Sequence, residues 1–517
     1  MKELVYHRLL LPTVERHADR PAFFDGDHGA TFAEHLDRVS RLASALGGLG
    51  VSRGDRFAVM ALNSHQFLEC YHAAFLGAGV INPLNLRLAP KELEYILADS
   101  ATKVCFTDQF FAPVIDKVRA ALGIEQVVLI GGGDAPHDLG YEELLASGTP
   151  EVPDEPDEDD PAVLMYTGGT TGLPKGVLLD QRAEMLNLYH VMEMWRFSPD
   201  DVFLHQTPMF HAASMGGMLG VPALGGASVF LPLFDPEKVL ALCEQYSVTQ
   251  TVMVPTMIGM LLNHPEFRPE RLASLRALTY GASPMPAALL EQLLSSFPGL
   301  DVFQGYGMTE SSAVLTALGP EDHRSGGARL QSAGRPLPGV VLSIQDPLGR
   351  VLPTGETGEV CARAGNFMTE YWKQPEATAD AFRGGWYHSG DAGYLDPDGF
   401  LFLVDRVKDM IVTGGENVYS IEVENAIASH PAVAQVAVIG IPSETWGEAV
   451  RAIVVLRLGE TATEQEIIDH AREWIAGYKV PKSVEFRSDP LPLSGAMKVL
   501  KRELRDPFWA GRGRAVN

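Results

Sequence analysis

Short apolar runs alternate with helical segments in the first part of the chain, and this rhythm restricts the fold more than any other feature of the sequence. Strands are expected at residues 56–61, 79–83 and 103–107, with helices between them at residues 64–76 and 90–98. Such alternation is typical of a mostly parallel sheet that is covered by helices. The sequence therefore predicts an α/β fold.

The same rhythm returns in segments 202–233 and 247–280, which predict a second layered α/β subdomain. Segment 334–403 is rich in Gly, Pro and short β-like runs, and it indicates a β-barrel-like subdomain or a smaller sheet. Residues 150–161 include seven acidic residues and four prolines, a composition too polar for a core element. We expect them to form a solvated connector.

Two capping signals place helices within this layout. Thr31 and Glu34 have capping-box spacing, and the apolar residues after them repeat at helical intervals as far as Gly47 and Gly48. Thr463 and Glu466 have the same spacing. Each pair predicts the start of a helix.

Beyond residue 408 the pattern changes to that of a small α+β domain. Helices are expected at residues 421–429 and 463–475, and strands at residues 435–440, 450–456 and 484–487. We therefore expect a large N-terminal domain of layered α/β subdomains, residues 1–407, and a small C-terminal domain, residues 408–517.

Composition narrows the class of protein. A net charge of −25 argues against a broad nucleic-acid or anionic-membrane surface. No apolar stretch approaches the roughly 18 residues of a membrane span, and no export signal is recognisable, so a cytoplasmic location is expected. The cysteines are widely separated and are expected to be core thiols: Cys70, Cys105, Cys243 and Cys361.

A glycine and threonine loop follows the apolar run 162–165 and predicts a phosphate site. Its glycines let the backbone approach a polyanion, and its hydroxyls and one lysine add further contacts. The candidates are Thr167, Gly168, Gly169, Thr170, Thr171, Gly172 and Lys175. The common nucleotide loop with Gly-Lys-Ser/Thr does not fit, because Pro174 precedes the lysine and Gly176 replaces the metal-binding hydroxyl.

The loop instead resembles the phosphate loop of the adenylate-forming superfamily, which includes acyl-CoA synthetases, luciferases and the adenylation domains of peptide synthetases. Seven further windows resemble the superfamily in the same order, so the match extends from about Tyr166 to Leu504. They begin at Pro208, Gly281, Gln304, Trp386, Asp405, Thr413 and Leu491. The chain is identified as a member of the acyl-CoA synthetase branch.

The resemblance implies roles for individual residues. Adenine and the inner end of the acyl slot would be enclosed by two windows that look like strand-exit turns, where open α/β sheets place ligands. Their residues are Gly281, Ala282, Ser283, Gln304, Gly305, Tyr306 and Gly307. Thr309 and Glu310 form an oxygen pair, for which a helix cap is the alternative. Magnesium would be bound by Glu310 and Thr167, since it prefers hard oxygen ligands.

The remaining windows imply the ribose, hinge and thiol contacts. Asp391 would bind the ribose hydroxyls, Arg406 would approach the ribose, and Lys408 would be the pivot of a mobile C-terminal domain. Gly415 belongs to the segment that would pass close to pantetheine.

Lys498 corresponds to the adenylation lysine of the family. Lys501 is a nearby competitor for the role. Many family members have Thr-Gly before this lysine, whereas this chain has Ala496 and Met497, so its turn is expected to be less flexible.

The family reaction implies two half-reactions. A carboxylate first attacks the α-phosphate of ATP to give acyl-AMP and pyrophosphate, and coenzyme A then takes the acyl group and releases AMP. His211 would flank the substrate carboxylate; amino-acid-activating relatives tend to have an aspartate there, so amino acids are disfavoured.

The acid itself is predicted from small residues. Ala212, Ala213, Gly216 and Gly217 are expected to leave a roomy apolar slot, which suits a medium- or long-chain fatty acid. Aryl acids of the cinnamate or benzoate kind and a steroid side-chain acid are the alternatives. A carrier-protein ligase and a luciferase-like oxygenase also remain open, as does a homodimer.

Overall fold

The computed structural model describes residues 4–167, 174–406, 409–414, 416–495 and 497–510. The predicted α/β rhythm is confirmed in its first sheet, where β3 (Arg56–Met60) pairs in parallel with β4 (Val80–Pro83) and β5 (Val104–Asp108). The other strands of this sheet are β6 (Gln126–Ile130), β7 (Leu139–Gly140), β8 (Pro161–Thr167), β9 (Lys175–Asp180) and β19 (Glu370–Tyr371).

Helices precede and separate these strands. Helix α2 (Phe32–Gly48) begins at the predicted capping box, in which the Thr31 hydroxyl accepts from the Glu34 amide and the Glu34 carboxylate accepts from the Thr31 amide. The other helices of this part are α1 (His7–His17), α3 (His65–Ala73), α4 (Pro90–Ser100), α5 (Ala112–Leu122) and α6 (Tyr141–Ser147).

The second large sheet contains the second predicted unit. Its centre is parallel, with β12 (Gln250–Met253) beside β13 (Ala277–Gly281) and β13 beside β14 (Asp301–Tyr306). The outer strands are β10 (Val202–His205), β11 (Ala227–Phe230), β15 (Thr316–Leu318), β16 (Arg335–Pro336), β1 (Pro21–Asp25) and β2 (His28–Thr31). The N-terminal hairpin β1–β2 therefore completes a sheet whose other strands come about 200 residues later in the chain.

Further helices surround this sheet and the small sheet. They are α7 (Gln181–Trp195), α8 (Met215–Leu224), α9 (Pro236–Tyr246), α10 (Pro255–Leu262), α11 (Ala287–Ser296), α12 (Pro320–Ser325) and α13 (Pro375–Ala381). Among the described residues, no helix combines the length and the apolar character that a membrane crossing requires.

Two forms were expected for segment 334–403, a β-barrel-like subdomain or a smaller sheet, and the structure has the smaller sheet. Its antiparallel strands follow the order β17 (Val341–Gln345), β18 (Gly358–Arg363), β20 (Tyr387–Leu395) and β21 (Leu401–Arg406). The connector before β8 is confirmed as irregular chain, but its acidic residues are not merely solvated, because Glu155 pairs with Arg8 and Asp160 with Arg53.

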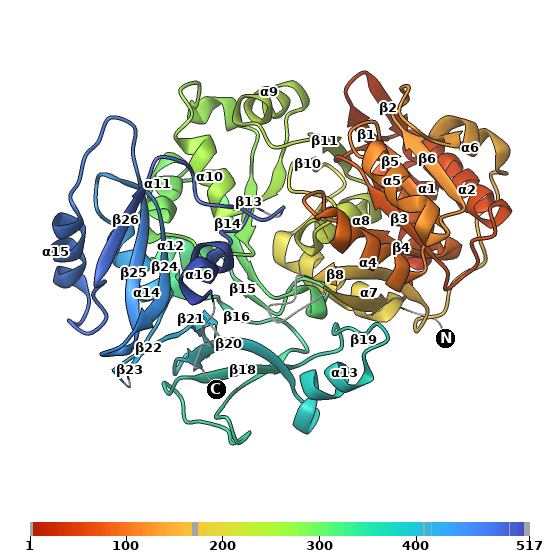
Figure 1. The fold of residues 1–517 in the computed structure, drawn as a ribbon. Coiled ribbons are helices and arrows are strands. Elements are labelled where there is room, and N and C mark those ends of the chain that lie inside the picture. Colours follow the sequence, from red (N-terminus) through yellow and green to blue (C-terminus); the bar gives the residue numbers. More distant parts are fainter. Residues whose placement is uncertain (1–3, 168–173, 407–408, 415, 496, 511–517) are drawn as a thin grey trace.

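The C-terminal part is the predicted α+β unit. Its sheet contains β22 (Ile411–Thr413), β23 (Glu416–Val418), β24 (Val433–Ser443), β25 (Gly447–Leu456) and β26 (Ser483–Arg487). Its helices are α14 (Ser420–Ala428), α15 (Glu464–Trp474), which has the predicted Thr463 cap, and α16 (Lys501–Trp509). This unit, blue in Figure 1, lies beside α10 and α11 of the large domain and has a hydrophobic core of its own.

Candidate active site

A cleft of about 3190 Å³ lies between the large domain and the C-terminal unit, and it brings the predicted site residues together. The described candidates that line it are Thr167, Lys175, His211, Gly281, Ala282, Ser283, Gln304, Gly305, Tyr306, Gly307, Thr309, Glu310, Asp391 and Lys498. The predicted residues 168–172, Lys408 and Gly415 lie outside the described residues, as does the side chain of Arg406.

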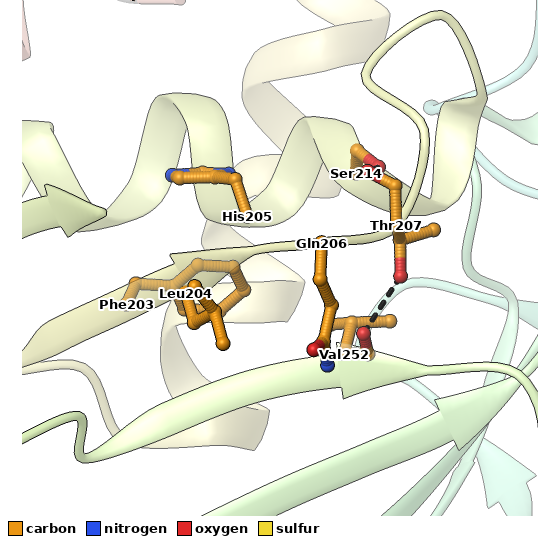
Figure 2. Close-up of a pocket in the computed structure, with 7 residues that line it drawn as sticks. All are labelled: Phe203, Leu204, His205, Gln206, Thr207, Ser214 and Val252. Atoms are coloured by element: carbon orange, nitrogen blue, oxygen red, sulfur yellow. Dashed lines mark hydrogen bonds between the residues drawn. The ribbon is translucent and has the colours of Figure 1, made fainter. Parts of the chain in front are cut away.

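A second cavity, between β10 and β12, is too small to bind a substrate. Figure 2 shows it beside Gln206, Thr207 and Val252, where the Thr207 hydroxyl donates to the Val252 carbonyl. Its volume of about 10 Å³ is close to that of a single water position. The large cleft is therefore the candidate site.

The ends of the phosphate loop are held by a β-hairpin. Thr167 and Lys175 are paired residues of the antiparallel strands β8 and β9, so both lie at the mouth of the loop. The Lys175 ammonium lies 4.7 Å from the centre of the Tyr371 ring, a cation–π contact. The Tyr371 hydroxyl donates to Glu310 Oε1 at 2.8 Å. Tyr371 thus links the lysine to the predicted metal-binding carboxylate.

Sequence reasoning did not find Tyr371. It lies in the two-residue strand β19, which pairs with β9 although nearly 200 residues separate them in the chain. A single tyrosine outside any recognisable window carries no local signal for such a pairing.

Close backbone contacts explain the glycines at the ends of β13 and β14. Gly281 pairs with Gly305, and a Cβ on Gly281 would lie 2.4 Å from the Gly305 carbonyl oxygen. A Cβ on Gly307 would lie 2.1 Å from the Ala313 carbonyl oxygen. Both distances are too short for any side chain, so the two strand ends pack together as bare backbone.

One local expectation about these windows was wrong, and one alternative is not supported. Gln304, Gly305 and Tyr306 belong to strand β14 and not to a turn after it, because β15 pairs with β14 as far as Tyr306. The residue that caps the short 3-10 turn Thr309–Ser311 is Met308, so Thr309 and Glu310 lie inside the turn. The helix-cap alternative for this pair is therefore not supported.

The predicted ribose residues are neighbours in the structure. The Tyr306 hydroxyl donates to Asp391 Oδ2 at 2.8 Å, which joins the second large sheet to the small sheet. Asp391 on β20 is paired with Arg406 on β21. A carboxylate with a fixed orientation thus faces the cleft.

His211 is held as a hydrogen-bond donor to the cleft. Its Nδ1 accepts from the Ala213 amide at 3.1 Å, so in the neutral ring the proton lies on Nε2. Burial and the positive charge of Lys498 lower the pKa of His211 to about 3, and the ring is neutral at pH 7. An Nε2–H donor beside a lysine is suited to a carboxylate ligand.

Lys498 lies at the end of a turn that contacts the large domain. The Ser494 amide donates to the Lys498 carbonyl at 2.7 Å, and Thr256 in α10 donates to the Met497 carbonyl at 3.0 Å. A Cβ on Gly495 would lie 2.2 Å from Asn85 Oδ1, so the turn fits tightly against the segment after β4.

Met497 adopts a backbone conformation that favours glycine. Its φ of 62° is in the left-handed region, at the position where many family members have glycine. Its side chain packs against the apolar cluster of α10 and α11. The left-handed φ of Met497 agrees with the expectation that this turn is less flexible than one with glycine.

The competing lysine is bound elsewhere. Lys501 begins α16, and its ammonium lies 2.7 Å from Glu424 and 2.6 Å from the Ser420 hydroxyl, both in α14. These contacts within the C-terminal unit raise the pKa of Lys501 and give its side chain a structural role.

A roomy slot was expected from Ala212, Ala213, Gly216 and Gly217; of these, Ala212, Ala213 and Gly216 line the cleft, whereas Gly217 is not among its lining residues. A Cβ on Gly216 would lie 2.8 Å from Val191 and 2.9 Å from the Trp195 ring, and one on Gly217 would lie 2.5 Å from the Phe203 ring. The two glycines therefore admit the neighbouring side chains of Val191, Trp195 and Phe203. Trp195 itself lines the cleft.

Comparison with known proteins gives consistent matches over most of the chain. Residues 11–372 match the AMP-binding enzyme family, and residues 422–498 match the AMP-binding enzyme C-terminal domain. A feruloyl-CoA synthase of an Amycolatopsis species is 40% identical over 93% of this chain and 95% of that protein. A long-chain-fatty-acid–CoA ligase of Mycobacterium tuberculosis is 37% identical over 93% of both. The structure of an anthranilate CoA ligase with anthranoyl-AMP matches with a TM-score of 0.90 and 27% identity, over 98% of this chain and 97% of that chain.

Proposed function

Since the chain belongs to the AMP-binding enzyme family, we propose that it is an acid–thiol ligase that converts a carboxylic acid into its coenzyme A thioester through an acyl-AMP intermediate. The observation that carries this proposal is the contact between the C-terminal turn and the cleft. His211 and Lys498 both line this cleft, and burial together with the positive charge of Lys498 lowers the pKa of His211. A lysine and a neutral imidazole donor at one point of a cleft suit a carboxylate that reacts with a phosphate.

In the first half-reaction a carboxylate oxygen of the acid attacks the α-phosphorus of ATP, and the bond to the β-phosphate oxygen breaks. Pyrophosphate leaves and the acid becomes a mixed anhydride with AMP. His211 Nε2 would donate to the carboxylate and orient it. The Lys498 ammonium would compensate the negative charge that builds up on the transferring phosphoryl group.

The donor set fits a magnesium ion bound with ATP. Glu310 uses one oxygen to accept from Tyr371, which fixes the carboxylate, and the Thr167 hydroxyl lines the same cleft. These are hard oxygen ligands of the kind that magnesium prefers. When bound, the metal would neutralise part of the phosphate charge. Lys175, fixed on the Tyr371 ring, would add charge beside the outer phosphates.

Asp391 would accept hydrogen bonds from the ribose hydroxyls, with Tyr306 holding the carboxylate in position. Gly281, Gly305 and Gly307, at the ends of β13 and β14, line the cleft and would contact adenine, as the resemblance implies. By resemblance to the family, Arg406 would approach the ribose and Lys408 would act at the hinge. Gly415 would lie close to the pantetheine of coenzyme A.

In the second half-reaction the thiolate of coenzyme A attacks the acyl carbon and displaces AMP. We propose that residues 408–517 rotate against residues 1–407 between the two steps, which would withdraw Lys498 and admit the thiol. The matched families end at residue 372 and begin again at residue 422, and this supports a domain boundary between them.

As the substrate acid, we propose a planar aryl acid such as a cinnamate as the first candidate. Trp195 and Val191 lie against Gly216, and all three line the cleft, so an indole ring forms part of the wall where room for an acyl chain was expected. A flat ring can stack on such a wall. A medium- or long-chain fatty acid is the second candidate, because Val191, Val252 and Val314, which share an apolar cluster with Trp195, also line the cleft.

A pyrophosphate-release assay tests the proposal. Purified protein with ATP, magnesium and coenzyme A is presented with aryl acids, with fatty acids of graded length and with an amino acid as control. We expect AMP, pyrophosphate and a thioester, with the highest kcat/KM for an aryl acid. Formation of ADP and phosphate would reject the mechanism. Replacement of coenzyme A by a phosphopantetheinylated carrier protein identifies the thiol acceptor.

The variant Trp195→Ala separates the two classes of acid. Loss of the indole would enlarge the cleft beside Gly216, so activity should move from aryl acids towards long-chain acids. Highest activity of the unchanged protein on long chains, with no gain in Trp195→Ala, would place the fatty acids first.

A further inference from the structure

A cluster of metal-ligating side chains lies next to the candidate ribose site but takes no part in it. Glu359 and Cys361 are two residues apart on β18 and therefore share one face of the strand. Cys361 is paired with His388 on β20. The ligand atoms of the three side chains all lie within 4.8 Å of one another.

The distances within the cluster suit one small cation. His388 Nδ1 lies 3.3 Å from Cys361 Sγ and 2.8 Å from Glu359 Oε2. A thiolate, an imidazole nitrogen and a carboxylate are the ligand types of protein zinc sites, and ligands around one zinc ion lie a few ångströms apart.

The orientation of the His388 ring suits a cation between the three groups. His388 Nε2 lies 3.2 Å from the Arg383 carbonyl oxygen, which can only accept. When the ring donates there, the lone pair of Nδ1 is directed towards Cys361 Sγ and Glu359 Oε2. A metal-binding histidine commonly donates its other nitrogen to a backbone carbonyl, as here.

We propose that Glu359, Cys361 and His388 form a binding site for Zn²⁺ or a similar thiophilic divalent cation. On binding, the Cys361 thiol loses its proton to solvent and forms a Zn–S bond, while Nδ1 and the Glu359 carboxylate supply two further bonds. Water from the cleft completes the tetrahedron, since Glu359 and His388 both line the cleft. No electron transfer is involved.

Two features oppose binding and limit its affinity. Burial raises the pKa of the Cys361 thiol to about 12, so the thiolate forms only together with the metal bond. The Arg383 guanidinium lies 2.9 Å from Glu359 Oε2 and must move away. Its side chain is about half exposed, at 48%, and has solvent into which it can turn.

Occupation of the site should act on the nucleotide. The Gly390 amide donates to Glu359 Oε1 at 3.1 Å, and Gly390 directly precedes Asp391. A metal ion that draws Glu359 towards Cys361 would weaken this hydrogen bond and displace Asp391 from its place beside Tyr306. Zinc should therefore inhibit the protein by weakening ATP binding. This consequence rests on the proposed function, whereas metal binding itself does not.

The test uses the full chain after removal of metals with a chelator. Co²⁺ is titrated while the thiolate-to-cobalt absorption band is followed, and Zn²⁺ affinity is measured by competition with a chromophoric chelator. We expect one equivalent with a cobalt–thiolate band. Cys361→Ser should remove the band, whereas Cys243→Ser, which changes another buried thiol, should retain it. The proposed metal site would be overturned if the cobalt–thiolate band were absent from the unchanged protein, or if it persisted in Cys361→Ser.

A second variant covers the case in which Cys361→Ser does not fold. Glu359→Gln keeps the shape of the side chain and should weaken zinc binding by more than about 10-fold. An unchanged affinity would also overturn the site. In steady-state assays, zinc should raise the KM for ATP of the unchanged protein more than that of Glu359→Gln. Zinc binding without ligase activity on any acid would reject the proposed function and leave the site intact.

Discussion

The hydroxyl of Thr256 in α10 donates a 3.0 Å hydrogen bond to the carbonyl of Met497, and this bond ties the turn before Lys498 to the large domain. Arg87, after β4, donates to the Leu493 carbonyl at the other end of the turn. The turn before Lys498 is therefore held by contacts of its backbone with the large domain, which is the arrangement that we propose for the first half-reaction.

Lys498→Met should separate the two half-reactions. We expect the rate of acyl-AMP formation from acid and ATP to fall by about 100-fold or more, because a charge that stabilises the transition state is lost. Thioester formation from presynthesised acyl-AMP should be retained. Single-turnover assays of each step measure this. Lys482→Met, which removes an exposed lysine of the same unit, is the control. An equal loss in both steps with an intact fold would contradict the assignment.

Met497→Gly and Met497→Ala together isolate the backbone strain of the turn. Both variants lose the Met497 side chain, but only alanine must still adopt a φ near 62°. The left-handed conformation costs a non-glycine residue about 1–2 kcal/mol, so the glycine variant should form acyl-AMP at least about fivefold faster than the alanine variant. Equal rates in stopped-flow pyrophosphate release would show that the strain does not affect the docked turn.

Tyr306→Phe should weaken ATP binding with little effect on the acid. The variant removes the 2.8 Å hydrogen bond that orients Asp391, and a hydrogen bond to a charged group contributes about 1.5–3 kcal/mol. We expect the KM for ATP to rise by about tenfold while the KM for the acid stays within about twofold. Steady-state kinetics measure both constants. The surface variant Tyr189→Phe is the control. An unchanged KM for ATP in Tyr306→Phe would contradict the proposed role of Tyr306 and Asp391 in binding the ribose.

Stability should fall as the pH falls below about 6.5. Burial lowers the pKa of His72 to about 4 and that of His205 to about 3, while both titrate near 6.5 in the unfolded chain. The unfolded state therefore binds more protons between pH 4 and 6.5, and the free energy of unfolding decreases with falling pH in that window. His72 alone should account for about 2 kcal/mol at pH 5. Urea unfolding at pH 7.5 and pH 5 measures the change, and equal stabilities would contradict burial of neutral histidines.

Local signals in the sequence were sufficient for many elements. The pairs Thr31–Glu34 and Thr463–Glu466 each form the expected capping box, because a cap depends only on residues within one turn. The strands of the first sheet were recognisable for a similar reason, since a buried parallel strand is a short apolar run between helices.

Contacts between distant segments were not predictable in this way. The extension of β14 through Tyr306 depends on pairing with β15, and the space beside Gly216 depends on the Trp195 ring of another helix. A glycine in the sequence shows that a side chain is absent there, but not which neighbour uses the room. The position of Tyr371 beside Glu310 and Lys175 likewise exists only once β19 has joined β9.

The early hairpin β1–β2 has a consequence for synthesis on the ribosome. Phe23 pairs with Ser228 of β11, so β1 has no neighbour on that side until more than 200 further residues have been translated. At about 5–20 residues per second this delay is on the order of 10–40 seconds. During that interval the edge of β1 is unpaired outside the ribosome, and nascent chains of this protein should depend on chaperones that bind this hairpin.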